Sequence, residues 1–213
     1  MPTNLTAAVP KSAAALLSSS LKRKEDGNRF FAKKRYTAAV ACYRSGLEDL
    51  PPYDKNNKAA VVAVDDIINL EVGLRSNIAL AILKLTETAS AGVEDETQKR
   101  EHYLQVEQEC SIALQLEEDL LLSKKNPNAK LFHRRGMARQ RLAEQVQLQH
   151  NQQIGNDVDN DGEAFNRRLD ELWRLAEEDF SRSVQILQEE QQQLQQQQRN
   201  SKDNAMSKKQ LGD

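Results

Sequence analysis

The sequence has few of the residues from which β-sheets are built. Aromatic residues make up 5% of its 213 residues and glycine occurs 8 times, whereas Gln, Leu, Ala, Glu and Lys dominate. These abundant residue types favour helices. The chain also has no apolar run near the ~20 residues that a membrane-spanning helix needs. We therefore expect an all-α protein that does not enter a membrane.

Neither charge sign is in excess, and cysteine is scarce. The net charge is −2, from 30 Lys and Arg against 32 Asp and Glu, so nothing predicts binding to nucleic acid or to an anionic membrane. Cys42 and Cys110 lie within helical patterns, which favours reduced core residues in a cytosolic protein. Residues 1–19 contain no Arg, unlike a transit peptide, and we expect a disordered tail there. Entry into the nucleus is left open.

The sequence lacks a recognisable set of catalytic or metal-binding residues. Its three histidines show no metal spacing, and no nucleophile triad, nucleotide loop or pair of catalytic acids can be assembled. Residues 157–168 begin like a calcium loop, but Arg168 stands where the loop needs a bidentate Glu. We read this stretch as an acidic loop between two helices. The expectation is a protein that is not an enzyme and needs no cofactor.

A spaced set of small, aromatic and proline residues begins at Gly27. Small residues let paired helices approach, aromatic rings fill the space between them, and proline ends the second helix. The spacing matches the tetratricopeptide (TPR) pattern and predicts two antiparallel helices. The matching residues are Gly27, Phe30, Ala39, Tyr43, Gly46 and Pro51.

The pattern returns twice, less regularly. In the second repeat Ala79 takes the glycine position and Ile82 follows at +3; the partner helix supplies Val106, Cys110 and Ala113. In the third, Gly136 pairs with Ala176, Phe180 and Ser183, while Arg139 replaces the expected aromatic residue. The two hairpins are longer than the first, because 27 residues separate Ala79 from Val106 and 40 separate Gly136 from Ala176, against 12 from Gly27 to Ala39.

The last helix carries an apolar stripe with helical steps, which predicts that these residues belong to the core of the repeat and that Trp173 is a packing residue.

We expect a three-repeat helical solenoid over residues 20–190, with repeats at about 20–54, 57–119 and 128–190. Residues 191–213 should form a Gln-rich helical extension and a disordered tail. The apolar stripe of the last helix named above comprises Phe165, Leu169, Leu172, Trp173, Ala176, Phe180, Val184 and Leu187.

Five polar residues occupy the first helices of the three repeats. Lys24 and Asn28 are one turn apart, as are Lys130 and Arg134, so each pair shares a helix face; Asn77 lies on the third helix. Stacked first helices would bring three cations and two amides to one groove. Cations and amides together can hold a carboxylate through charge-assisted hydrogen bonds.

This arrangement resembles the dicarboxylate-clamp class of TPR co-chaperones. The motif of that class is Lys-x-x-x-Asn in the first helix, Asn in the third and Lys-x-x-x-Arg in the fifth, and "KEDGN", "SNIAL" and "KLFHR" match it here. The resemblance implies binding of the C-terminal Glu-Glu-Val-Asp of seventy- and ninety-kilodalton heat-shock chaperones. Lys24, Asn28, Asn77 and Lys130 would hold the terminal carboxylates, and Arg134 would add a contact to acidic side chains or backbone.

Three further residues, Leu80, Leu83 and Lys84, should face the same groove and contact the residue upstream of the acidic tetrapeptide. A core role for the two leucines is an equal alternative. Arg141 stands where clamp domains often carry an aromatic residue, which leaves the preference between the two chaperone classes open. Two rival hypotheses also stay open: a scaffold for internal acidic segments, and weak self-association through the C-terminal helix.

Overall fold

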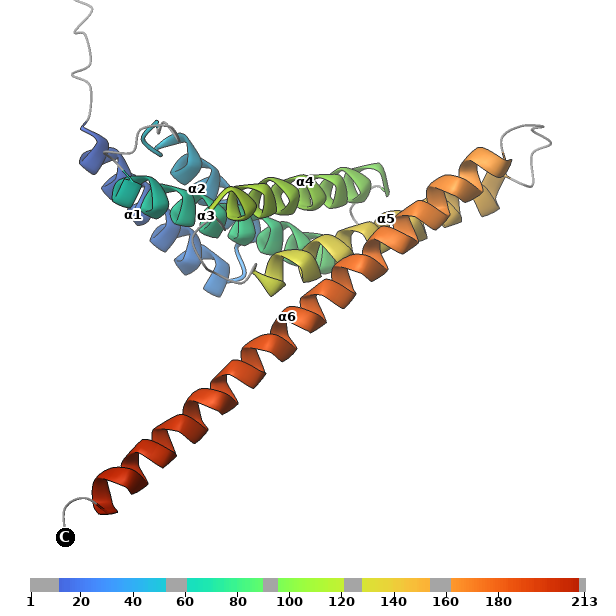
Figure 1. The fold of residues 1–213 in the computed structure, drawn as a ribbon. Helices are drawn as coiled ribbons and strands as arrows, with labels where there is room; N and C mark the ends of the chain where they lie inside the picture. Colours follow the sequence, from blue (N-terminus) through green and yellow to red (C-terminus); the bar gives the residue numbers. More distant parts are fainter. Residues whose placement is uncertain (1–11, 53–60, 90–95, 121–127, 154–161, 211–213) are drawn as a thin grey trace, which may run out of the picture. The chain divides into compact units, whose positions relative to one another are not determined.

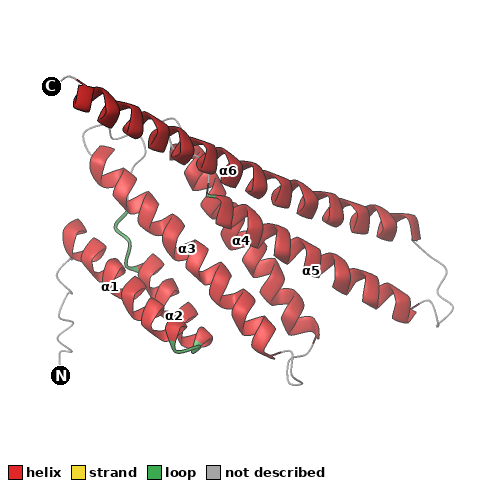
Figure 2. Ribbon diagram, turned by 90° about the horizontal axis from the view of Figure 1, so that it is seen from below, coloured by secondary structure: helices red, strands yellow, loops and turns green. Residues whose placement is uncertain are grey.

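The computed structural model describes residues 12–52, 61–89, 96–120, 128–153 and 162–210, and these residues contain helices and no strand (Figure 2). The all-α prediction is therefore confirmed. The chain divides into two units, Met1–Leu120 and Leu121–Asp213. The helices, labelled in Figure 1, are α1 (Ala13–Ala32), α2 (Tyr36–Glu48), α3 (Val61–Ala89), α4 (Glu96–Leu120), α5 (Ala129–Gln153) and α6 (Gly162–Gln210).

The first unit consists of two helix hairpins packed on each other. α1 pairs with α2, α3 pairs with α4, and α2 joins the hairpins by packing on α3. Gly27 of α1 lies directly against the ring of Tyr43, and Gly46 of α2 lies against Leu74 of α3. Ala79, which takes the glycine position of the second repeat, is fully buried. The partner residues predicted from the spacing, Val106, Cys110 and Ala113, are also fully buried.

The extra residues of the second and third repeats mostly lengthen helices. α3 and α4 have 29 and 25 residues, whereas α1 and α2 have 20 and 13. Leucine, alanine, glutamate and glutamine continue through the added turns, and these residues have high helix propensity. The hairpins of the second and third repeats therefore differ from the first in length rather than in kind.

The second unit is one hairpin in which the predicted apolar core stripe of α6 is partly wrong. Gly136 of α5 lies close to Phe180 and to the backbone of Ala176, as the spacing predicts. The buried positions are Ala176, Asp179, Ser183 and Ile186. Three residues of the predicted core stripe instead expose much of their surface: Trp173 (38%), Val184 (52%) and Leu187 (53%). Ser183 is buried where the repeat spacing places it, whereas the buried Asp179 is a polar residue that an apolar pattern overlooks.

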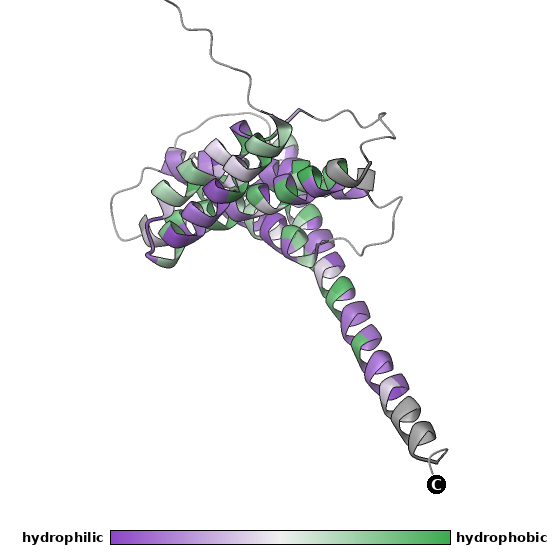
Figure 3. Cartoon of the chain, turned by 90° about the vertical axis from the view of Figure 1, so that its left-hand side faces the viewer, coloured by the Kyte–Doolittle hydropathy of each residue, from purple (hydrophilic) through white to green (hydrophobic). Residues whose placement is uncertain are grey.

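α6 is about twice as long as its partner, with 49 residues against 25 for α5. At 1.5 Å per residue, much of its C-terminal half therefore runs beyond α5. Figure 3 shows this part in mainly hydrophilic colours, interrupted by isolated hydrophobic residues. The predicted helical extension after residue 190 is confirmed as far as Gln210.

The N-terminal boundary differs from the expected one. α1 begins at Ala13, so residues 13–19 are helical and do not belong to a disordered tail. Ser12 caps this helix, because its side chain accepts a 3.2 Å hydrogen bond from the backbone N–H of Ala15. The rest of the predicted tail lies outside the described residues, as do the acidic positions Asp157, Asp159 and Asp161 of the calcium-like segment.

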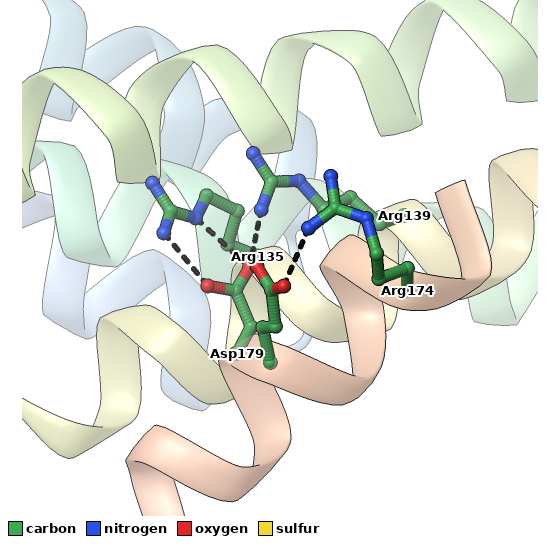
Figure 4. Close-up of polar contacts among 5 residues, drawn as sticks. Arg135, Arg139, Arg174 and Asp179 are labelled. Atoms are coloured by element: carbon green, nitrogen blue, oxygen red, sulfur yellow. Dashed lines mark hydrogen bonds and ion pairs between the residues drawn. The ribbon is translucent and has the colours of Figure 1, made fainter. Parts of the chain in front are cut away.

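A buried ion cluster explains why Arg139 replaces an aromatic residue. Asp179 of α6 is 3% exposed and accepts hydrogen bonds from Arg135 at 2.7 and 2.9 Å and from Arg139 at 2.9 Å (Figure 4). One carboxylate thus joins two guanidinium groups of α5 across the hairpin. In the third repeat, the ion pair of Arg139 with Asp179 therefore connects α5 to α6, where an aromatic ring at position 139 would have made a packing contact.

Replacing Asp179 by Asn should destabilise the α5/α6 hairpin by about 3 kcal/mol, because two half-buried arginines would lose their counter-charge. Glu178→Gln is the matched control, since Glu178 pairs with Arg174 at the surface and should contribute less than about 1 kcal/mol. Urea denaturation followed by circular dichroism measures both. Equal effects of the two variants would contradict the role given to the cluster.

Gly27→Ala should destabilise the first unit by about 1–3 kcal/mol, because a Cβ atom there would overlap the ring of Tyr43. This cost should exceed the gain in helix propensity from alanine. Gly162→Ala is the control, since a Cβ atom at Gly162 meets nothing within 4 Å. Thermal denaturation compares the variants; a Gly27→Ala protein as stable as the parent would refute the close-packing argument.

Candidate functional site

Two of the predicted clamp residues are in direct contact. Nδ2 of Asn77 on α3 donates a 3.2 Å hydrogen bond to Oδ1 of Asn28 on α1. The hydroxyl of Tyr43 on α2 donates to the same oxygen at 2.8 Å. Helices α1, α2 and α3 therefore meet at the amide of Asn28. Asn28 is an exposed residue.

The third clamp residue of this unit, Lys24, lies beside them. Its Nζ is 2.9 Å from the point where a Cβ atom would stand on Gly73 of α3. Gly73 precedes Asn77 by one helical turn, so the two residues share a face of α3. The missing side chain at Gly73 thus leaves room for the ammonium group against α3, one helical turn before Asn77. We call Lys24, Asn28 and Asn77 the α1/α3 donor cluster.

The neighbouring charged groups on α3 have their own partners. Arg75 donates to Glu71 at 2.8 Å and to Glu109 of α4 at 2.8 Å. Burial lowers the pKa of Arg75, but the hydrogen bonds to Glu71 and Glu109 outweigh it and leave that pKa raised. Arg75 is therefore a fixed cation that ties α3 to α4. Its two carboxylate partners are engaged away from the donor cluster's amides.

Tyr43 remains a neutral hydroxyl over the physiological pH range. Burial, with a smaller contribution from the neighbouring Cys42, raises the pKa of Tyr43 to about 12. Its side chain therefore keeps the proton that it donates to Asn28. An ionised tyrosine could not donate this hydrogen bond.

The remaining two clamp residues are in the second unit. Lys130 is exposed and lies in the first turn of α5, where Oδ1 of Asn128 caps the helix by accepting from the Lys130 backbone N–H at 3.1 Å. Arg134 follows one turn later and is half-buried. Three of the clamp residues thus lie in the first unit and two in the second, and the convergence of all five stays a prediction.

The three auxiliary residues of α3 have different environments. Leu83 is 4% exposed and belongs to the core, which is the second of the two roles considered for it. Leu80 is half-buried. Lys84 forms a 2.6 Å ion pair with Glu87 on its own helix. Arg141 of α5 likewise pairs with Glu144 at 2.7 Å.

Sequence reasoning did not identify Tyr43 and Gly73 as parts of the site. The pattern gives Tyr43 a packing role, and only the choice of tyrosine over phenylalanine signals a use for the hydroxyl. Gly73 could have been noticed as a glycine inside a long helix of a glycine-poor chain, one turn before Asn77. A glycine inside a helix costs about 1 kcal/mol relative to alanine, so its use at this position draws attention.

The described residues give no support for metal or membrane sites. No group of three or more His, Cys, Asp or Glu side chains among them could hold a metal ion. Within the same residues, no helix combines the length and the hydropathy needed to cross a bilayer.

Comparison with known proteins yields little. No protein-family model matches the sequence, and no curated protein matches it significantly. Among solved structures, the chain is similar to the C-terminal TPR-containing domain of a putative FK506-binding protein from Plasmodium falciparum. The sequence identity is 16% and the TM-score 0.44, over 85% of this chain and 97% of that chain. A similarity this low says nothing about ligands.

Proposed function

We propose that the chain is a TPR-type adaptor that binds the acidic C-terminus of a partner protein. The observation that carries the proposal is the α1/α3 donor cluster, in which an ammonium group and two amides gather on one surface of the first unit. A carboxylate can accept hydrogen bonds from the ammonium group and from the amide N–H groups. Hydrogen bonds to a charged group contribute about 1.5–3 kcal/mol each.

Lys130 supports the same ligand chemistry. A cation in the first turn of a helix is opposed by the helix dipole, so Lys130 does not serve the stability of α5. The first turn of α5 contains no acidic residue that would compensate it. An anionic ligand near this turn would interact favourably with both the ammonium group and the dipole.

The partner that we propose is the Glu-Glu-Val-Asp terminus of a cytosolic heat-shock chaperone of the seventy- or ninety-kilodalton class. The choice of this partner depends on the match of five residue identities with the carboxylate-clamp motif: Lys24, Asn28, Asn77, Lys130 and Arg134. Because peptide ordering opposes binding, we expect a dissociation constant near ~1 μM that weakens with salt.

Calorimetric titration with a peptide ending in Glu-Glu-Val-Asp tests this proposal. The free acid should bind and the C-terminal amide should not. Lys24→Ala should weaken binding by at least about tenfold, because it removes a charge-assisted bond. Lys22→Ala is the matched control, since Lys22 is an exposed lysine of the same helix and carries the same charge.

Equal binding of acid and amide would point to a scaffold for internal acidic segments. If Lys22→Ala and Lys24→Ala lost equal amounts of affinity, the effect would come from net charge and not from the position of Lys24. Lys130→Ala extends the test to the second unit: an unchanged affinity in that variant would confine the site to the α1/α3 donor cluster and refute the five-residue clamp.

Gly73→Ala separates binding from stability. Alanine should stabilise α3 by about 0.5–1 kcal/mol relative to glycine, yet its Cβ atom would displace the ammonium group of Lys24. We expect a higher melting temperature together with an affinity for the free-acid peptide that is several-fold lower. A variant that is more stable and binds equally well would show that the position of Lys24 does not matter.

A second candidate function, self-association through α6, has its own observation. Val184, Leu187 and Leu194 expose 52–59% of their surfaces, and their steps of three and seven place them on one stripe of the helix. Such a stripe can pair with another helix. Light scattering across a concentration series decides this alternative, because a mass that stays monomeric in the full chain would exclude it.

A further inference from the structure

The amide oxygen of Asn28 is fully occupied within the protein. It accepts the hydroxyl hydrogen of Tyr43 at 2.8 Å and an Nδ2 hydrogen of Asn77 at 3.2 Å. A carbonyl oxygen has two lone pairs, so these two donors use its capacity. What Asn28 retains for a ligand is its Nδ2 group, which has two N–H donors and no acceptor.

Tyr43 is held firmly enough to impose this orientation. Its side chain is 1% exposed, and the ring lies against the backbone of α1 at Gly27. Fixed at this contact, the ring directs its hydroxyl at Asn28, which lies next to Gly27 in the sequence. The residue that packs the first hairpin therefore also donates the hydrogen bond that holds the amide oxygen of Asn28 on the protein side.

We propose that Tyr43 is a positioning residue that makes Asn28 a donor-only group and so favours an ionised carboxylate over a carboxamide at Asn28. The identity of the ligand rests on the proposed function above. The orientation of the amide is a property of the free protein and does not rest on it.

The selectivity follows from hydrogen-bond matching. An ionised carboxylate has only acceptors, and each can take an N–H of Asn28 or the ammonium group of Lys24. A carboxamide has an NH₂ group in place of one of the carboxylate oxygens. This NH₂ group would face the N–H donors of Asn28, and a donor facing another donor has no acceptor. Were the amide of Asn28 turned over, its oxygen would face the ligand and repel a carboxylate.

The first experiment needs no ligand. In protein labelled with ¹⁵N-asparagine, Tyr43→Phe should shift the side-chain NH₂ signals of Asn28 and Asn77, while Tyr36→Phe should leave both in place. Tyr36 is a suitable control because it lies on the same helix and its ring contacts Phe31 instead. Unchanged Asn28 signals in Tyr43→Phe would overturn the inference whether or not any peptide binds.

The second experiment measures selectivity by calorimetry, using the free-acid and amide forms of the acidic peptide. Tyr43→Phe keeps the ring against Gly27, so losing one hydrogen bond should lower the melting temperature only slightly, whereas the affinity for the acid should fall about 3–10-fold. The preference for acid over amide should fall by a similar factor. Tyr36→Phe should change neither quantity.

Asn28→Asp provides the sharpest variant. Its carboxylate can still accept from Tyr43 and Asn77, but its second oxygen replaces the donors, so binding of the free acid should be lost while the fold persists. If the parent protein binds the acid and Tyr43→Phe keeps the full preference for it, the inference fails and the proposed function stands. If the parent binds neither peptide, the proposed function fails, and the NMR result alone decides whether Tyr43 orients Asn28.

Discussion

The contact between Gly27 and the ring of Tyr43 is the constraint from which the first unit is built. It brings α1 and α2 so close that a single Cβ atom at Gly27 would not fit. The same contact fixes the Tyr43 hydroxyl under Asn28, and α3 reaches the same amide through Asn77. Packing and site geometry therefore share one pair of residues. A change that loosened the hairpin would also release the amide.

The sequence predicted the hairpins well because their determinants are local and periodic. Small residues at Gly27, Ala79 and Gly136 mark close approaches, and the fixed spacing of their partners identifies the second helix of each repeat. The boundary at Ala13 was missed because a Ser- and Ala-rich stretch has no apolar periodicity to reveal a helix. Helix propensity and the cap at Ser12 sufficed there.

The register of α6 was harder to predict because burial there does not follow hydropathy. Asp179 is buried by its pairing with Arg135 and Arg139, while Val184 and Leu187 remain exposed. An apolar pattern cannot show that a carboxylate has two guanidinium partners on another helix. The signal was present in Arg139, the cation that stands in an aromatic position.

The candidate site, too, could be predicted from the sequence only in part. The spacing of Lys24 and Asn28 could be read from α1 alone, and the placement of Asn77 followed from the repeat. The polarity of Asn28 could not, because it depends on which atom of its amide is already bonded, and one of the two bonds comes from Tyr43, 15 residues away in sequence. Neutral amides become selective only when their other half is engaged, since a free amide offers a donor and an acceptor equally. The internal hydrogen bonds of Asn28 are therefore what would turn a polar surface into a site for one charge sign.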